Sequence, residues 1–204
     1  MAGRVVDARV DSVIFRDFPG VVGELLPEQF TGLVIGERFD RIERRGKHLW
    51  LAFEGGNGLF VHLMMTGQLL VLPAASEPAR FEHLRLGLSN GWELAYADQR
   101  KFGRVKWLTD DQWAAKERVI GPEPLDDDFT PQLLAQQLKS RTTPIKALLL
   151  DQRRIAGIGN IYADEALYRA GIHPGRPAGS LSVGEVEALH TAIRAVLREG
   201  IERR

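Results

Sequence analysis

The sequence has no cysteine, which excludes disulfide bonds and any cysteine-ligated metal site. Its five histidines show no metal-ligand spacing such as HxxxH, so we expect no metal cofactor in this chain. No uninterrupted apolar run reaches the roughly 18 residues of a membrane-spanning helix, and the start MAGRVVDARV lacks the basic and apolar segments of a signal peptide. We therefore expect a cytoplasmic protein that has no membrane partner.

Net charge is also absent, because 27 basic residues balance 27 acidic residues. The charge is uneven along the chain, however, with basic surpluses at residues 38–48, 98–106 and 139–154. In the second of these segments Asp98 offsets part of the positive charge and Phe102 lies among the basic residues. One basic segment is usually a solvated charged face. Three of them, one with an aromatic ring, are more typical of a surface that follows a phosphate backbone.

The first half of the chain is typical of an antiparallel sheet. Short β-branched or aromatic runs with period-two stretches fill residues 4–108. Glycine-rich turns at residues 54–58 and 89–91 join neighbouring runs, and the Asn-Gly pair in the second turn is expected to supply positive φ angles. The segment ELLPEQFTG is expected to add a short helix. We predict a β-sandwich or barrel.

The second half changes to helical periodicity. Thr130 is expected to cap a helix that opens with Pro131, and Ser182 and Glu185 are expected to form a capping box at the start of the last helix. We therefore predict an α+β protein in three segments: a β-sandwich domain at residues 1–108, a connecting helix and linker at 109–129, and a helical domain at 130–204.

The stretch RIAGIGNIYADEAL, residues 154–167, sets Gly157, Gly159 and Asn160 directly before a predicted helix. A glycine-rich turn at a helix N-terminus presents unpaired amide groups and the positive end of the helix dipole, and both favour an anion such as phosphate. Alternatively, the glycines form a tight turn between helices and Asn160 is an N-cap. The spacing by itself does not separate these interpretations.

Several motifs together resemble the formamidopyrimidine-DNA glycosylase family of bifunctional DNA glycosylase/AP lyases. They are RRGKHLWL, HLMMTGQL, DQRKFGRV, GPEPL, IKALLLDQ and GIGNIYADEALYRAGIHP, in this order over residues 3–204. The resemblance implies a β-sandwich followed by a helix–two-turns–helix DNA-binding domain. It also implies base-excision repair of oxidised purines such as 8-oxoguanine and formamidopyrimidines, with double-stranded DNA as the partner of a monomeric enzyme. A location at the bacterial nucleoid follows from the same resemblance.

The resemblance gives five residues a role at the DNA backbone. Lys47 matches a lysine that contacts phosphate and donates a proton during β-elimination, although a lysine at a strand end needs no such role. His62 matches a phosphate-contacting histidine, and a lone histidine is otherwise often structural. Three basic or amide residues of the second domain match DNA contacts: Arg141, Lys146 and Asn160.

The resemblance gives three further residues a role at the base stack. An enzyme that acts on a base turns it out of the duplex and must fill the space that it leaves. Met65, Arg100 and Phe102 match the residues that fill this space. Each residue type suits this role, because methionine is flexible, arginine donates to the orphaned base, and phenylalanine can wedge between bases. Without the resemblance, Met65 and Phe102 would be expected in the core.

The sequence also departs from the family. The family nucleophile is an N-terminal proline followed by a catalytic glutamate, whereas this sequence begins Met-Ala-Gly-Arg, and it has no cysteine for the family's zinc finger. Met64, Gln99 and Lys101 replace the usual glycine, proline and arginine. Two hypotheses follow: a glycosylase/AP lyase of which this chain is a fragment, with its activity lost here, or an inactive paralogue that clamps damaged or abasic DNA. A weaker third hypothesis is a structural protein that binds RNA.

Overall fold

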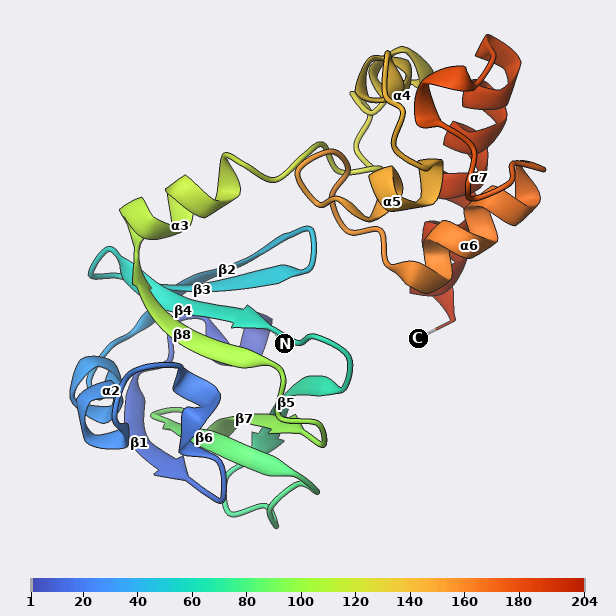
Figure 1. Ribbon diagram of the computed structural model, residues 1–204. Helices are drawn as coiled ribbons and strands as arrows, with labels where there is room; N and C mark the ends of the chain where they lie inside the picture. The colour runs from blue at the N-terminus through green and yellow to red at the C-terminus, as the bar shows by residue number, and fades with distance from the viewer. Residues whose placement is uncertain (1, 204) are drawn as a thin grey trace. The chain divides into compact units, whose positions relative to one another are not determined.

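The structure is a computed structural model that describes residues 2–203. The chain divides into two compact units, and the boundary falls between Lys116 and Glu117. The first unit contains two four-stranded sheets in the orders β1-β6-β7-β5 and β2-β3-β4-β8, and all paired strands are antiparallel (Figure 1). The strands are β1 (Val10–Phe15), β2 (Phe39–Arg45), β3 (His48–Phe53), β4 (Asn57–His62), β5 (Gly67–Pro73), β6 (Glu82–Leu88), β7 (Trp92–Asp98) and β8 (Arg104–Thr109).

Apolar side chains from both sheets form one core in this unit. Large buried members include Phe30, Phe39, Leu51, Leu84 and Tyr96, each at most 2% exposed. Burial on this scale is the main force that holds two sheets face to face. The arrangement confirms the predicted α+β class and identifies the sheet structure as a sandwich.

The beginning of the chain differs from the prediction of strand from residue 4. A short helix, α1 (Ala2–Val5), precedes β1, and Asp7 has a φ of 66°, which interrupts an extended conformation. Val5 and Ala8 are nevertheless buried in the sandwich core, and this explains their apolar character. The helix expected in ELLPEQFTG is present as α2 (Pro27–Val34), after the short 3-10 helix η1 (Pro19–Val22).

Helix α3 (Asp110–Glu117) lies in the segment that the sequence assigned to a connection, yet it packs on the sandwich. Because side chains alternate along a strand, Leu51 faces the core while Trp50 faces outward. Trp113 of α3 stacks on Trp50 with ring centroids 5.5 Å apart and planes within 9°. This contact covers the outer face of the second sheet.

The second unit is helical and consists of α4 (Pro131–Leu138), α5 (Ile145–Leu150), α6 (Asn160–Arg169), the 3-10 helix η2 (Ala178–Ser180) and α7 (Val183–Glu202). The predicted caps are confirmed, since Thr130 accepts a hydrogen bond from the amide of Leu133 and Ser182 forms the capping box with Glu185. Apolar residues of α7 such as Leu189 and Ile193 are buried in the core of this unit, whereas Ile201 near the end of the helix is 64% exposed.

The remainder of the predicted linker is attached to the second unit. The Arg194 guanidinium of α7 donates to the carbonyl oxygens of Pro124 and Asp126 at 3.0 and 2.6 Å. The amide of Gly121 donates to the carbonyl of Gln152 at 2.8 Å. The acidic stretch after Gly121 is therefore held in place by the helical core and does not behave as a loose connection.

No helix within residues 2–203 is both long enough and apolar enough to cross a lipid bilayer.

Candidate nucleic-acid interface

Two loops that carry predicted site residues lie together at one end of the sandwich. The first, residues 63–66, joins β4 of one sheet to β5 of the other, and the second, residues 99–103, returns from β7 to β8. His62 pairs with Arg104 across one sheet, and Gly67 pairs with Asp98 across the other. Because these pairs are the last residues before and after the loops, both crossings occur at the same end.

The two loops bring Met65, Arg100 and Phe102 into contact at the surface. Met65 is 69% exposed and Phe102 is 49% exposed, which excludes the alternative that they pack in the core. The Arg100 guanidinium lies 4.8 Å from the centre of the Phe102 ring and donates to the sulfur of Met65 at 3.0 Å. A flexible apolar group, a cation and a ring thus form one exposed cluster, which we call the wedge cluster.

Asp98 holds both loops, and the sequence had shown it only as a charge that offsets a basic segment. Its carboxylate is buried and accepts hydrogen bonds from the Thr66 hydroxyl, from the Arg100 amide at 3.1 Å and from the Gly103 amide at 2.8 Å. Burial would raise the pKa of Asp98, but these donors, together with the Phe102 amide, outweigh it and lower the pKa below its ordinary value. The ionised carboxylate therefore fixes the loop that presents Arg100 and Phe102.

Two glycines at the loop ends, Gly67 and Gly103, lie so close to the Tyr96 side chain that a larger residue would not fit. A Cβ atom on Gly103 would lie 1.7 Å from the Tyr96 hydroxyl oxygen, and one on Gly67 would lie 2.5 Å from it. The Tyr96 hydroxyl is buried and has no hydrogen-bonding partner among the described residues, and burial followed by the nearby Asp98 charge raises its pKa. Tyr96 therefore forms the floor beneath both loops.

Lys47 and His62 lie at the same end of the sandwich. Lys47 belongs to the turn between β2 and β3, and the next residue, His48, pairs with His62. Partial burial lowers the pKa of Lys47, while burial and then the Lys47 charge lower the pKa of His62. Burial, the proximity of His62 and other positive charges lower the pKa of His48 to about 4. Lys47 is therefore the cation of this group at neutral pH.

The backbone beside His62 shows why glycine is the usual residue at the position that Met64 occupies in this chain. Met64 has a φ of 52°, in the left-handed region that glycine adopts most easily, and its amide donates to His62 Nδ1 at 3.0 Å. Glycine, the usual residue at this position, would adopt this conformation without strain. The hydrogen bond also makes Nδ1 an acceptor, so the proton of a neutral His62 ring lies on Nε2.

In the second unit, the glycine-rich turn leads into α6 as predicted, but Asn160 is not the N-cap. Gly159 occupies the cap position, Asn160 is the first helical residue, and its exposed side chain has no hydrogen-bonding partner within residues 2–203. Lys146 of α5 forms an ion pair with Asp164 at 2.7 Å. Since Asp164 lies one turn after Asn160 on the same helix face, Lys146 and Asn160 belong to one surface.

Arg141 is also exposed, but no described contact connects it with Asn160 or Lys146. Its backbone is fixed by a hydrogen bond from the Gly179 amide to its carbonyl at 2.8 Å. The structure thus brings together two of the three site residues predicted in the helical unit.

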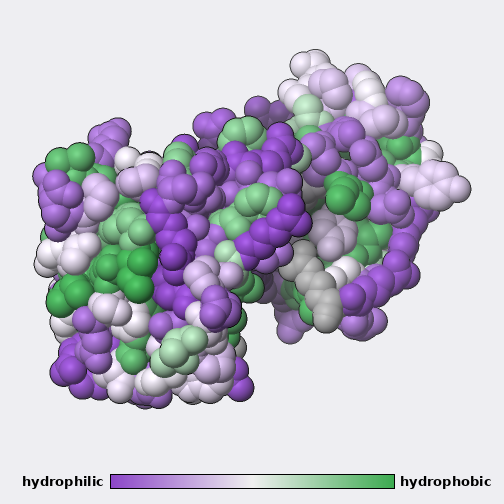
Figure 2. Space-filling view, turned by 90° about the horizontal axis from the view of Figure 1, so that it is seen from below, coloured by the Kyte–Doolittle hydropathy of each residue, from purple (hydrophilic) through white to green (hydrophobic). Residues whose placement is uncertain are grey.

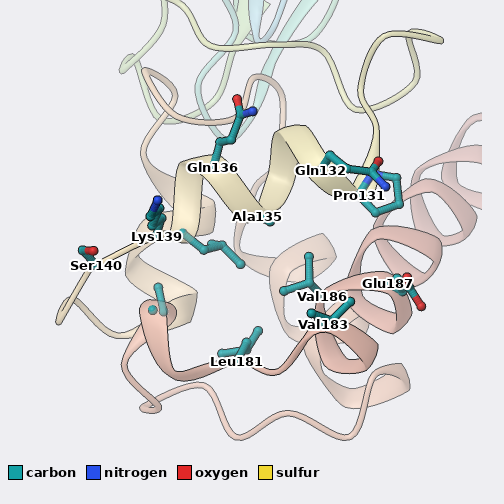
Figure 3. A pocket seen from close by; sticks show the side chains of 13 residues that line it. Pro131, Gln132, Ala135, Gln136, Lys139, Ser140, Leu181, Val183, Val186 and Glu187 are labelled. Carbon is teal, nitrogen blue, oxygen red and sulfur yellow. The ribbon is translucent and has the colours of Figure 1, made fainter.

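A separate groove of about 570 Å³ lies between α4 and the start of α7 (Figure 3). Leu181, Val183 and Val186 face Ala135 across it, and none of the predicted site residues lines it. Hydrophobic groups also reach the surface among hydrophilic ones elsewhere (Figure 2), so exposed apolar area alone does not mark the site.

The described residues also include no group of three or more His, Asp or Glu side chains placed to hold a metal ion. The zinc finger that the family resemblance implies uses four cysteines, and this sequence has none to supply.

An antiparallel β-sandwich followed by a helical unit with an exposed asparagine after a glycine-rich turn defines the class of two-domain helix–two-turns–helix proteins. Residues 1–105 match the formamidopyrimidine-DNA glycosylase N-terminal domain, and residues 120–204 match the formamidopyrimidine-DNA glycosylase H2TH domain. The chain belongs to the formamidopyrimidine-DNA glycosylase family.

Individual relatives agree with this assignment. The formamidopyrimidine-DNA glycosylase of Chloroflexus aggregans is 52% identical over 86% of this chain, and that of Roseiflexus sp. is 46% identical over 97%. The chain spans 64% of the length of the first and 72% of the second.

Solved structures are similar over nearly the whole chain. Lactococcus lactis formamidopyrimidine-DNA glycosylase bound non-covalently to DNA with an AP site has a TM-score of 0.87 and 32% identity, over 98% of this chain and 77% of that one. MutM in complex with DNA containing carbocyclic 8-oxo-G has a TM-score of 0.88 and 33% identity, over 98% of this chain and 74% of that one.

Proposed function

We propose that this chain carries the DNA-holding and proton-donating residues of a DNA glycosylase and AP lyase that acts in base-excision repair and removes oxidised purines, such as 8-oxoguanine and formamidopyrimidines, from duplex DNA. The observation that supports this most directly is the wedge cluster of Met65, Arg100 and Phe102. Met65 and Phe102 are exposed, yet the loops that carry them are held in place by Asp98 and Tyr96. Rigid support of exposed side chains is typical of a binding site.

Each member of the wedge cluster fits a step in holding an extruded nucleotide. Turning a base out of the stack costs a few kcal/mol and leaves a gap. Met65 and Phe102 offer apolar surface to refill the stack, and Arg100 offers fork-like donors to the unpaired opposite base. The Arg100 contacts with Met65 and Phe102 keep this surface assembled before DNA arrives.

Lys47 supplies the proton-transfer group of the proposal. Its ammonium lies near the wedge cluster end of the sandwich, and burial lowers its pKa. A lower pKa makes an ammonium a better proton donor, which suits donation to the leaving oxygen during β-elimination, and its charge also suits a phosphate contact. His62, neutral beside Lys47, has its Nε2 proton available for a phosphate oxygen.

The helical unit supplies backbone contacts in this proposal. Asn160 offers a side-chain amide beside the unpaired amides of the α6 N-terminus, and this combination binds phosphate well. Lys146 on the same surface and exposed Arg141 add positive charge. When Lys146 contacts phosphate, it would either leave its ion pair with Asp164 or bind both groups at once.

A binding experiment tests these assignments. Fluorescence anisotropy would compare a duplex that carries an abasic-site analogue with an undamaged duplex at several salt concentrations. Lys47→Ala is expected to weaken binding to both duplexes and to reduce the salt slope by about one, and Asn160→Ala is expected to weaken binding to both duplexes. Phe102→Ala is expected to lower the preference for the abasic duplex about tenfold, because stacking on an aromatic side chain is worth roughly 1–3 kcal/mol.

Arg41→Ala is the matched control for the loss of charge. Arg41 is exposed and already bound to Asp40 and Glu43, so its removal should leave the salt slope unchanged. Equal effects of Arg41→Ala and Lys47→Ala would refute the assignment of Lys47 to the interface.

The same residues support a second function, in which the chain clamps damaged or abasic duplex without cutting it. Borohydride trapping on an 8-oxoguanine duplex separates the two, because only a Schiff-base intermediate is converted into a stable covalent adduct. An adduct supports the glycosylase/AP lyase. Selective binding without an adduct agrees with the sequence-based expectation that the cutting activity is lost in this chain, and it supports the clamp.

A further inference from the structure

His83 of β6 is a buried histidine whose two ring nitrogens both contact acceptor oxygens. The ring is 1% exposed. Nδ1 lies 2.8 Å from a carboxylate oxygen of Asp17, and Nε2 lies 2.8 Å from the backbone carbonyl oxygen of Asp98. Neither oxygen has a hydrogen to donate when Asp17 is ionised.

This geometry specifies a protonation state. A neutral imidazole has one N–H group and one lone pair, so either tautomer would place a lone pair against an oxygen at 2.8 Å. Only the imidazolium donates to both. Hydrogen bonds from Lys101 and then from His83 lower the pKa of Asp17, which keeps its carboxylate ionised as the counter-ion.

The charged groups around His83 come from three directions. Asp17 and the Lys101 ammonium, 2.9 Å from the second Asp17 oxygen, lie on the Nδ1 side. The Phe18 ring packs edge-on against His83. The guanidinium of Arg104, a residue of β8, lies 5.6 Å from the centre of the Phe18 ring. On the Nε2 side the Asp98 carboxylate is occupied by Thr66 and loop amides.

The neighbouring residue on β6 does not compete as a counter-ion. Glu82 is buried and bound by Arg16 at 2.8 Å and by Arg85 at 2.6 Å. Asp17 is therefore the carboxylate that balances the imidazolium.

We propose that His83 is a protonated positioning residue that holds the wedge loop, residues 99–103, from both sides. Its imidazolium fixes the Asp98 carbonyl at the start of the loop and orients Asp17, and Asp17 in turn holds Lys101 within the loop. The role of the loop in DNA binding rests on the proposed function, but the connection itself does not. Loss of the His83 ring removes both hydrogen bonds and loosens the loop.

The first test uses the chain without DNA. At pH 6.5, NMR of histidine-labelled protein should show two slowly exchanging ring N–H protons for His83, assigned by their loss in His83→Gln. Hydrogen exchange of the Arg100 and Gly103 amides, which are bonded to Asp98, should be about tenfold faster in His83→Gln. A single ring proton, or unchanged exchange in this variant, would overturn the proposal.

A second variant covers the possibility that His83→Gln disturbs folding. Asp17 is largely exposed, so Asp17→Asn should leave the sandwich folded while it weakens the link to Lys101, and the same amides should exchange faster. Asp11→Asn on β1 removes an exposed carboxylate that bonds Arg9, and it should change neither amide. Equal behaviour of the two asparagine variants would contradict the proposed link.

The third test adds DNA. The preference for abasic over undamaged duplex should fall about tenfold in His83→Gln and in Asp17→Asn relative to the wild-type chain, and it should be unchanged in Asp11→Asn. An unchanged preference in both His83→Gln and Asp17→Asn would overturn the proposal. An absence of preference in the wild-type chain would refute the wedge function, while the NMR and exchange results would still decide the role of His83.

Discussion

Replacement of Gly103 by alanine would test whether Tyr96 is the floor of the wedge loop. The added Cβ would lie 1.7 Å from the Tyr96 hydroxyl oxygen, 2.8 Å from the His62 carbonyl oxygen and 3.0 Å from Tyr96 Cζ. Ordinary contacts of a methyl group begin near 3.4 Å, so all three neighbours would have to move. Tyr96 is buried and cannot rotate away, and the carbonyl belongs to the last residue of β4.

The expected cost follows from overpacking. Insertion of one methyl group into a tightly packed site typically costs about 1–3 kcal/mol. We expect the upper end, about 3 kcal/mol, because one of the contacted atoms belongs to the backbone of a paired strand. Gly32→Ala is the control, since Gly32 has nothing within 4 Å of its added Cβ and lies inside α2. It should be neutral or stabilising by roughly 0.5–1 kcal/mol.

The assay can report on the sandwich unit alone. All four tryptophans of the chain, Trp50, Trp92, Trp107 and Trp113, lie in the first unit. Urea unfolding followed by tryptophan fluorescence therefore measures the free energy of unfolding of the unit that contains Gly103, by linear extrapolation.

Tyr96→Phe in the same background gives the decisive comparison. It removes the oxygen at 1.7 Å and a buried hydroxyl that has no described partner, so it should restore about 1–2 kcal/mol to Gly103→Ala. The remaining close contacts would prevent full recovery. Simple additivity of the two substitutions, or a cost for Gly103→Ala no larger than for Gly32→Ala, would refute the account of Tyr96 as the floor.

Two more predictions concern other parts of the structure. The folded-state pKa of Asp98 is depressed, so its contribution to stability is complete above the ordinary value near 3.8 and is lost as pH falls through the lower folded value; urea unfolding between pH 2 and 6 should therefore show a shallower acid loss in Asp98→Asn, and parallel curves would contradict this. Ser182→Ala removes the N-cap of α7 and should cost about 1 kcal/mol in thermal unfolding followed by circular dichroism. Thr191→Ala, whose hydroxyl bonds only to the Glu187 carbonyl within the same helix, should cost clearly less, and the tryptophan transition should not move with Ser182→Ala.

Local patterns predicted much of the fold, because the features concerned are encoded by neighbouring residues. The period-two runs correspond to paired strands, and the caps at Thr130 and Ser182 form as expected. The Asn-Gly turn was predicted in place but not in detail: Gly91 has a φ of 80°, while Asn90 keeps a negative φ and accepts a hydrogen bond from the Trp92 amide.

Features that depend on distant contacts were not predictable in the same way. The helical periodicity of the sequence predicts that α3 is a helix. It does not predict that Trp113 stacks on Trp50, because the two residues are far apart in the sequence. The role of Asp98 also depends on a partner in another loop, Thr66. An acid at the end of a strand, directly before a basic loop, was the only available signal. The motifs located the wedge cluster, and the structure shows what fixes it.

The short connection between the units has a consequence for the energetics of DNA engagement. Helix α3 ends at Glu117 and the Gly121 amide is bonded to Gln152, so three residues, 118–120, separate these two points of the chain. A chain of this length extends at most about 14 Å. Once either unit rests on a duplex, such a tether holds the other at an effective concentration on the order of millimolar or higher. Under the proposed function each unit would need only weak, millimolar affinity for DNA, and the joined chain would still stay bound and could move along the duplex by releasing one unit at a time.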